Sequence, residues 1–125
     1  MKEWAFKKFG NEHGISDVDD WREELPPKAR ARMDLIISHL EITENWRDIK
    51  YITPLAGYEG ILEIKFTVQS KQYRPLGCYG PEKTFIILIG AEEKGDRFIP
   101  QSAPETAVKR RKMVLEDKRY VHEYY

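Results

Sequence analysis

The sequence contains only one cysteine, Cys78, so the chain can form no internal disulfide. Sparse cysteine is typical of proteins in a reducing cytosol, and we expect a cytoplasmic location. Long apolar runs are absent too. The longest, residues 85–89, has the length of a strand, whereas a membrane-spanning helix needs about 18 apolar residues. The first residues lack the apolar segment of a secretory signal, and we expect no membrane partner.

Motifs that hold metals, nucleotides or catalytic nucleophiles are also missing. The three histidines and the cysteine lack the spacing of metal ligands, so no zinc site is expected. The sequence has neither a glycine-rich phosphate-binding loop nor a nucleophile elbow. No neighbouring residue would activate Cys78, which we predict to be a packed, unreactive thiol. We therefore expect neither a metal nor a cofactor.

An excess of one charge is missing as well, because 21 Lys and Arg residues balance 21 Asp and Glu residues. The two halves differ, however. Residues 1–60 hold 9 basic and 12 acidic side chains, whereas residues 61–125 hold 12 basic and 9 acidic ones. Nucleic-acid-binding domains are usually more basic overall. Any phosphate binding must therefore be local, and the second half is the place to seek it.

The first half of the sequence has the pattern of one strand followed by two helices. Residues 4–9 predict a strand, and Ser16 or Asp17 can cap a short helix that ends before Pro26. Pro27 is well placed to begin the next helix. The apolar stripe of that helix, at spacing i, i+3, i+4 and i+7, consists of Met33, Ile36, Ile37 and Leu40.

The second half has three strand-like segments, at residues 60–68, 71–79 and 84–90. Because the links between them are short, we predict an antiparallel meander. A polar loop follows at 91–97, and Ser102 with Glu105 predicts a capping box that opens a final helix. The predicted buried side of this helix consists of Ala107, Val108, Val114 and Leu115. The anchors expected in the connector at 44–60 are Trp46, Ile52 and Leu55.

Two isolated cations, Lys65 and Arg74, lie inside the first two of these segments, where apolar residues normally dominate. Two interpretations are open. The cations are ordinary solvent-facing residues of a half-exposed sheet, or they form a surface that grips phosphates. Arginine suits the second role because its planar fork binds a phosphate through two hydrogen bonds. RNA is then the first partner to consider.

The chain as a whole resembles the RelE/HigB family of toxin–antitoxin toxins, most closely its phage-derived subgroup. The passages that carry the resemblance are residues 24–32, 62–66, 72–74 and 85–90, the last followed by a charged loop. The resemblance implies one α+β domain over residues 1–125 with a RelE-like fold. In that fold a small antiparallel sheet, made of the N-terminal strand and the three-stranded meander, packs with two N-terminal helices and a C-terminal helix.

The family resemblance also implies a function. We expect the toxin component of a toxin–antitoxin system, a ribosome-associated endoribonuclease that cleaves mRNA by attack of the 2′-hydroxyl without a metal. The implied partners are mRNA, the ribosome and a helix-turn-helix antitoxin, with a dimer or a heterotetramer including the antitoxin as the assembly. A catalytically silent RelE-fold protein that binds RNA, ribosome or antitoxin is the alternative. A third interpretation is a phage-related structural or regulatory protein that kept only the scaffold.

Several residues match positions that act in the family. Arg74 matches a strand arginine, Lys65 matches a strand lysine, and the loop with Lys94 and Arg97 matches a region that supplies a further cation. Glu63 lies on the same strand face as Lys65, either as a general base or simply paired with it. The residues nearest to the family's C-terminal proton donor are Tyr120 and His122.

Other residues are candidates for holding RNA rather than cutting it. Tyr73 or Tyr79 can stack a base, and Lys71 and Arg110 are candidate phosphate contacts. The basic run at 109–112 has a competing interpretation as a solvated helix face.

Pro75 and Gly77 interrupt the strand that carries Arg74 and predict a bulge or an edge. We also expect Arg74→Ala to reduce cleavage about a hundredfold while leaving the fold intact, because it removes one phosphate-directed donor and no core atom.

Overall fold

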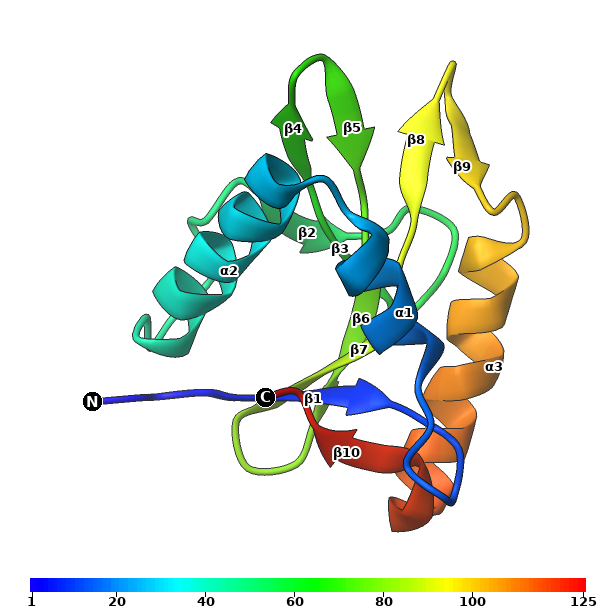
Figure 1. Ribbon diagram of the computed structural model, residues 1–125. Coiled ribbons are helices and arrows are strands. Elements are labelled where there is room, and N and C mark those ends of the chain that lie inside the picture. The colour runs from blue at the N-terminus through cyan, green and yellow to red at the C-terminus, as the bar shows by residue number, and fades with distance from the viewer.

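Helices cover both faces of a six-stranded sheet in the computed structural model, which describes residues 1–125 (Figure 1). The helices are α1 (Asp17–Glu24), α2 (Pro27–Glu41) and α3 (Ala103–Glu116), with a 3-10 turn η1 (Lys118–Tyr120). The strands are β1 (Ala5–Phe9), β2 (Ile52–Pro54), β3 (Leu62–Ile64), β4 (Phe66–Val68), β5 (Lys71–Tyr73), β6 (Leu76–Gly80), β7 (Thr84–Ile89), β8 (Glu92–Lys94), β9 (Arg97–Ile99) and β10 (Val121–Glu123). The α+β class expected from the sequence is confirmed.

The larger sheet has the strand order β10-β1-β7-β6-β3-β2. Its N-terminal strand pairs in parallel with β7, with Phe6 opposite Phe85, and antiparallel with β10. The expectation of a purely antiparallel sheet is therefore wrong. The reason is topological. The helices α1 and α2 and the strands from β2 to β6 lie between β1 and β7 in the chain, and so long a connection allows parallel pairing.

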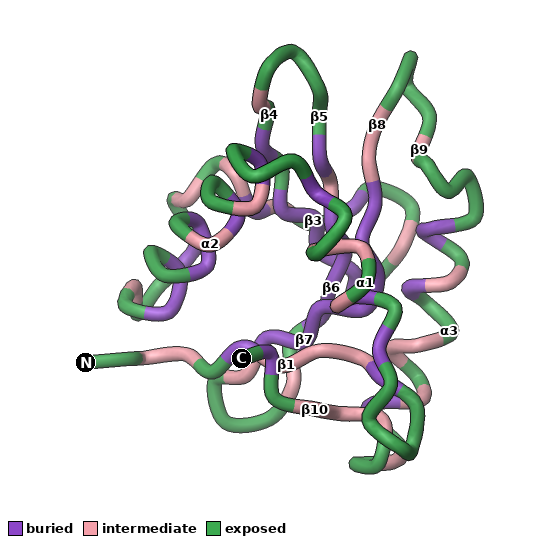
Figure 2. The backbone as a smooth tube through the Cα atoms, in the orientation of Figure 1, coloured by how far each residue is buried: buried purple, intermediate pink, exposed green.

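The hydrophobic core has two parts, one on each face of this sheet. Alternate side chains of β7 point to opposite faces. Phe85 and Ile87 pack with α1 and α2, whereas Ile86 and Leu88 pack with α3. Every residue of the predicted α2 stripe is buried, so that prediction is confirmed. Figure 2 shows the same pattern as a continuous buried path along β3, β6 and β7.

A second, four-stranded sheet with the order β4-β5-β8-β9 consists of two hairpins that project from one end of the molecule (Figure 1). It arises because the two long strands predicted at 60–68 and 71–79 are each divided. Lys65 separates β3 from β4, and Arg74 with Pro75 separates β5 from β6. The chain thus passes between the sheets at both cations. A register shift at Leu76/Gly77 agrees with the irregularity predicted from Pro75.

The helix ends follow the sequence only in part. The Ser16 side chain accepts a hydrogen bond from the backbone N–H of Val18 and caps α1 as predicted. The capping box predicted for α3 is wrong, since Ser102 makes no side-chain cap and Glu105 instead accepts a hydrogen bond from the Tyr58 hydroxyl at 2.6 Å. Two residues predicted to lie on the buried side of α3 are exposed, namely Val108 and Leu115.

The segment after α3 is ordered as a strand. β10 pairs with β1, and Tyr124 beyond it is buried in the core. Burial raises the pKa of Tyr124 to about 12. The connector before β3 is fixed by the three anchors predicted from the sequence, Trp46, Ile52 and Leu55, all of which are buried. None of the helices has the length and apolar character that crossing a membrane would require.

Candidate functional site

The place where the chain passes between the two sheets is held by backbone hydrogen bonds. Lys65 donates from its backbone N–H to the carbonyl of Tyr51 at 2.8 Å, and Arg74 donates to the carbonyl of Ala91 at 2.8 Å. Pro75 has no N–H to donate, but its carbonyl accepts from Ile64 at 3.0 Å. The irregular backbone is therefore satisfied, and it fixes the directions of the Lys65 and Arg74 side chains.

Arg74 is held between two carboxylates. Its Nε donates to Glu63 Oε2 at 2.9 Å, its Nη2 donates to the same oxygen, and its Nη1 donates to Glu93 Oε1. The guanidinium carbon also lies 4.3 Å from the centre of the Phe98 ring. Glu63 is only 5% exposed, so Arg74 supplies the compensation that a buried carboxylate requires. Together with Lys65, these residues form what we call the Arg74 cluster (Glu63, Lys65, Arg74 and Glu93).

Glu93 and Phe98 were missed by the sequence analysis, which expected a loop at 91–97. They belong to the β8–β9 hairpin, whose turn has Gly95 and Asp96 at positive φ, 54° and 63°. A Gly-Asp pair between two short strands is a hairpin signal that was available in the sequence. The contact of Glu93 with Arg74 had no such signal, because it depends on the long-range pairing of β5 with β8.

Lys65 is the accessible cation of the Arg74 cluster. Its side chain is 49% exposed and lies 3.6 Å from Glu63 Oε1, so Glu63 contacts both predicted cations. Lys65 and Arg74 line a hollow of about 360 Å³ on the small sheet. A hollow of this size fits within the range of small-ligand sites.

The hairpins carry three further cations predicted to belong to the site. Lys71 on β5 pairs with Glu92 at 3.0 Å, and this hydrogen bond raises the pKa of Lys71. Lys94 and Arg97 lie directly opposite each other across β8 and β9, and both are exposed. By the alternation of strand side chains, all three cations lie on the face of the small sheet opposite Glu93. The fold therefore does not bring Lys71, Lys94 and Arg97 to the carboxylates that hold Arg74.

Three of the predicted site residues are either buried or distant from the Arg74 cluster. Tyr73 is 2% exposed and stacks on Phe66 at 5.2 Å, so it offers no face to a base. Both Nη atoms of Arg110 bind Asp17, and Nη1 also donates to the carbonyl of Leu88.

His122 lies on β10, where its Nε2 is 2.8 Å from the carbonyl oxygen of Asn11. Four strand spacings separate β10 from β3, which amounts to about 19 Å. Tyr120 stacks on Phe9 on the same side of the molecule. Neither of the C-terminal residues considered as proton donors therefore lies at the Arg74 cluster.

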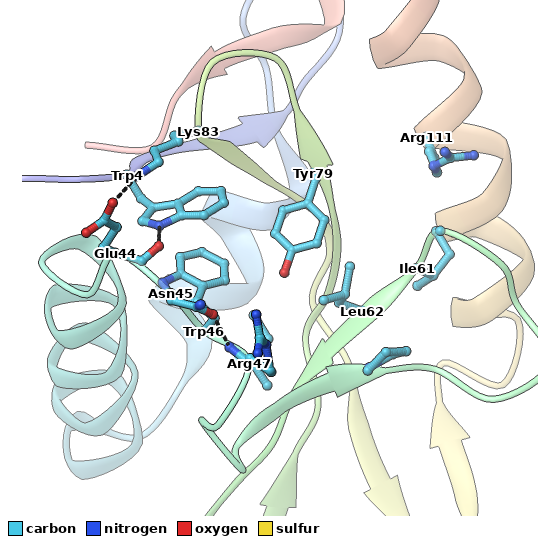
Figure 3. A pocket seen from close by; sticks show the side chains of 13 residues that line it. Trp4, Glu44, Asn45, Trp46, Arg47, Ile61, Leu62, Tyr79, Lys83 and Arg111 are labelled. Atoms are coloured by element: carbon cyan, nitrogen blue, oxygen red, sulfur yellow. Dashed lines mark hydrogen bonds and ion pairs between the residues drawn. The ribbon is translucent and has the colours of Figure 1, made fainter.

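Tyr79, the remaining RNA-binding candidate, lies in a different concave region (Figure 3). This region has a volume of about 1010 Å³ and forms where β6 continues beyond the start of β3. Trp4 stacks on Trp46 with ring centres 4.2 Å apart, and Tyr79 lies 5.6 Å from Trp4 and 5.9 Å from Trp46. We call it the aromatic pocket. The sequence analysis did not find it, because its residues are far apart in the chain.

Cys78 precedes Tyr79 on β6 but points into the opposite part of the core. It packs with Leu76, Ile86 and Leu88 beneath α3. Burial raises the pKa of its thiol to about 11. A thiol of this kind is neutral at physiological pH, which agrees with the prediction of an unreactive packed residue.

The Arg74 cluster has the chemical means to bind an anion and to move a proton. A guanidinium has five N–H donors, and the carboxylates use three of those of Arg74. One hydrogen on each terminal nitrogen is left for a ligand. Lys65 adds a mobile charge, and Glu63 and Glu93 are potential proton acceptors. No group of three or more His, Cys, Asp and Glu side chains is placed to hold a metal ion.

Comparison with known proteins gives one match that bears on these features. Neither the curated proteins nor the solved structures include a match to this chain. A family model described as phage-derived protein Gp49-like matches residues 20–112. This range runs from α1 to α3 and includes the Arg74 cluster, the small sheet and most of the aromatic pocket. It covers well over half of the sequence, and the chain therefore belongs to the Gp49-like family of phage-derived proteins.

Proposed function

We propose that this protein is the toxin component of a toxin–antitoxin system and that it cleaves mRNA on the ribosome at the Arg74 cluster. The observation that carries the proposal is the accessible Lys65 beside an arginine that two carboxylates hold in a fixed orientation. Fixed donors that face a developing charge are the strongest single contribution to catalysis. Membership of a phage-derived family is consistent with such a role.

The proposed reaction is transesterification within the RNA. The 2′-oxygen forms a bond to the adjacent phosphorus while the bond from phosphorus to the 5′-oxygen breaks. The 2′-hydroxyl proton passes to Glu93, whose side chain is more exposed than that of Glu63. Lys65 is the nearest exposed donor that can protonate the leaving 5′-oxygen. The free N–H groups of Arg74 stabilise the charge that builds up on the phosphate oxygens.

The order of elements supports a RelE-like fold as part of this proposal. An N-terminal strand, two helices, a meander and a C-terminal helix follow one another, and β1 lies beside the last meander strand. The breaks after β3 and β5 are compatible with such a fold, because they carry the two cations that match the family's strand lysine and strand arginine. A helix-turn-helix antitoxin and a cytoplasmic location belong to the same proposal.

Primer extension on a defined mRNA in a reconstituted translation system tests the proposal. We expect new 5′ ends at ribosome-occupied codons. A 2′-deoxy nucleotide at the cleaved position should abolish them, because it removes the attacking hydroxyl. Lys65→Gln should reduce cleavage about a hundredfold or more, whereas Lys118→Gln, an exposed lysine of η1, should not. Intact mRNA in the presence of folded protein would refute the proposal.

Arg74→Lys is the matched variant for the arginine. Lysine keeps the positive charge that Glu63 and Glu93 need, but it cannot present a planar fork to a phosphate. We expect the protein to fold and cleavage to fall. Arg74→Ala is less informative than the sequence suggested, since it leaves the buried Glu63 carboxylate without its main partner.

A catalytically silent binding protein is the second candidate, and one observation favours it. Three of the five N–H donors of Arg74 are already used by carboxylates in the absence of RNA. A phosphate must therefore share or displace these partners. Co-sedimentation with ribosomes distinguishes the candidates. Binding without cleavage supports the silent protein, and binding with cleavage supports the toxin.

A further inference from the structure

We propose that the aromatic pocket is a second nucleic-acid site, which binds a stretch of single-stranded RNA through one stacked base and the phosphate next to it. The proposal depends on the proposed function only in its choice of RNA as the polymer. It concerns binding, and it holds whether or not the Arg74 cluster cuts the strand.

The rings of the aromatic pocket are fixed before any ligand arrives. Trp46 donates from its indole N–H to the carbonyls of Leu40 and Thr43, at 3.0 and 2.9 Å. Trp4 donates to the carbonyl of Glu44 at 3.0 Å. Both indole N–H groups are therefore satisfied by the protein, which leaves the ring faces for packing. Tyr79, packed against both indoles, is 45% exposed and is the ring available to a base.

The pocket also contains cations without acidic partners. Arg47 and Arg111 line it, and no carboxylate lies within ion-pair distance of either side chain. Lys83 is only loosely paired, at 3.7 Å from Glu44 and 3.8 Å from Glu3. Glu44 is the single acidic residue among those that line the pocket. The surplus of positive charge fits a phosphate beside the rings.

Arg111 reaches the pocket because Gly60 has no side chain. Gly60 has φ +81°, and a Cβ there would lie 2.6 Å from the guanidinium carbon of Arg111. Figure 3 shows Arg111 extending from α3 on the side of the pocket opposite the three rings, with Ile61 and Leu62 between them. A base on the rings and a phosphate at Arg111 can thus be bound together.

The lining of the pocket favours RNA over a peptide as its occupant, because its surplus charge is positive and its exposed ring, Tyr79, can stack a base. The pocket is separate from the Arg74 cluster. Leu62 lines the pocket and the next residue, Glu63, belongs to the cluster, and successive side chains of a strand point to opposite faces of the sheet. The pocket's volume of about 1010 Å³ also exceeds what one base requires.

Tryptophan fluorescence tests the inference directly, because two of the three tryptophans lie in the pocket. The third, Trp21, packs near Tyr73 in the core, and Trp21→Phe removes its background. The probe is a short single-stranded RNA with 2′-O-methyl groups, which cannot undergo the proposed cleavage. We expect saturable quenching in both the original protein and the Trp21→Phe variant.

Variants then separate base stacking from phosphate contact. Tyr79→Ala should weaken binding about tenfold or more without changing its salt dependence, since stacking carries no charge. Arg111→Gln should weaken binding and reduce the slope of log affinity against log salt by about 1. Lys112→Gln, the same loss of charge one residue further along α3, is the matched control and should leave the slope unchanged.

Quenching with these variant effects supports RNA binding at the aromatic pocket even if primer extension detects no cleavage. Binding at the pocket and cleavage at the Arg74 cluster can therefore be refuted independently of each other. Absence of saturable quenching overturns the proposed binding, as does an equal effect of Arg111→Gln and Lys112→Gln, which would indicate nonspecific attraction. Retention of full affinity by Tyr79→Ala also overturns it. Quenching by an acidic peptide but not by RNA would assign the pocket to a protein partner instead.

Discussion

The Arg74 cluster and the aromatic pocket both place arginines at a concave surface, but the partners of these arginines differ. Arg74 is bound by two carboxylates and an aromatic ring, and one of those carboxylates is buried. Arg47 and Arg111 have no carboxylate partner. The strand β6 connects the two regions, since Arg74 precedes it by two residues and Tyr79 lies near its end.

The difference distinguishes arginines that stabilise the fold from arginines that are free to bind a ligand. An arginine that compensates a buried carboxylate contributes to stability, and its removal leaves an unpaired charge behind. An arginine without a partner contributes little to stability and remains available to a ligand. A functional role for Arg74 therefore requires it to serve both purposes.

The largest effect should come from Arg74→Ala. Removal of the guanidinium leaves Glu63 buried without its main partner, and breaking a buried pair costs about 3–5 kcal/mol. Urea denaturation measures this loss. The paired change Glu63→Leu with Arg74→Leu is the control and should cost less, because no buried charge is then left alone. A loss below about 1 kcal/mol for Arg74→Ala would show that the Arg74 cluster is not a structural unit.

The next effect concerns the strand that joins the two regions. Burial raises the pKa of Cys78 from 9.0 to about 11, so its contribution is complete below pH 9 and is lost as the pH rises to 11. We expect a decline of about 3 kcal/mol over this window, from about 1.4 kcal/mol per unit. Urea denaturation from pH 8 to 11 measures it. Cys78→Ala should flatten the decline, whereas an unchanged profile would contradict the assignment.

A smaller effect is expected from Gly60→Ala in the aromatic pocket. The left-handed conformation at φ +81° disfavours a side chain, which costs about 1–2 kcal/mol. The added Cβ also displaces Arg111. We expect lower RNA affinity together with a modest loss of stability. Gly57→Ala has a similar φ and open space around it, so it should cost stability alone.

The smallest effects on stability should come from Arg47→Gln and Arg111→Gln. Neither variant breaks an ion pair, and surface substitutions of this kind usually change stability by less than about 0.5 kcal/mol. Thermal denaturation of both variants beside Arg74→Ala makes the comparison quantitative. A large loss of stability for Arg111→Gln would mean that the packing of Arg111 over Gly60 stabilises the fold. Arg111 would then resemble Arg74 rather than differ from it.

Local patterns in the sequence predicted much of the fold. The α2 stripe, the cap at Ser16 and the apolar run of β7 depend on neighbouring residues, and the structure agrees with each. The divided strands did not follow from the sequence. Their breaks at Lys65 and Arg74 depend on pairing between β5 and β8, which are separated along the chain by β6 and β7. Sequence periodicity carries no information on which of two sheets a strand joins.

The sequence predicted the cations of the candidate site but did not predict that Glu93 pairs with Arg74. Lys65 and Arg74 stood out because charges are unusual within apolar segments. Glu93 lies in a charged stretch where one more acid carries no signal. The aromatic pocket unites Trp4, Trp46 and Tyr79 from three separate parts of the chain, so only the folded structure relates them.

The position of β1 between β7 and β10 has a consequence for synthesis of the protein. β1 is made first, yet its partners begin at Thr84 and Val121. At ~5–20 residues per second, the ribosome needs several seconds to produce them, and during that interval β1 has two unpaired edges. Lys7 and Lys8 in its middle are charges of the kind that protect exposed strands from aggregation. The sheet can therefore close only late in translation, so the nascent chain passes through a period in which its first strand must stay soluble by itself.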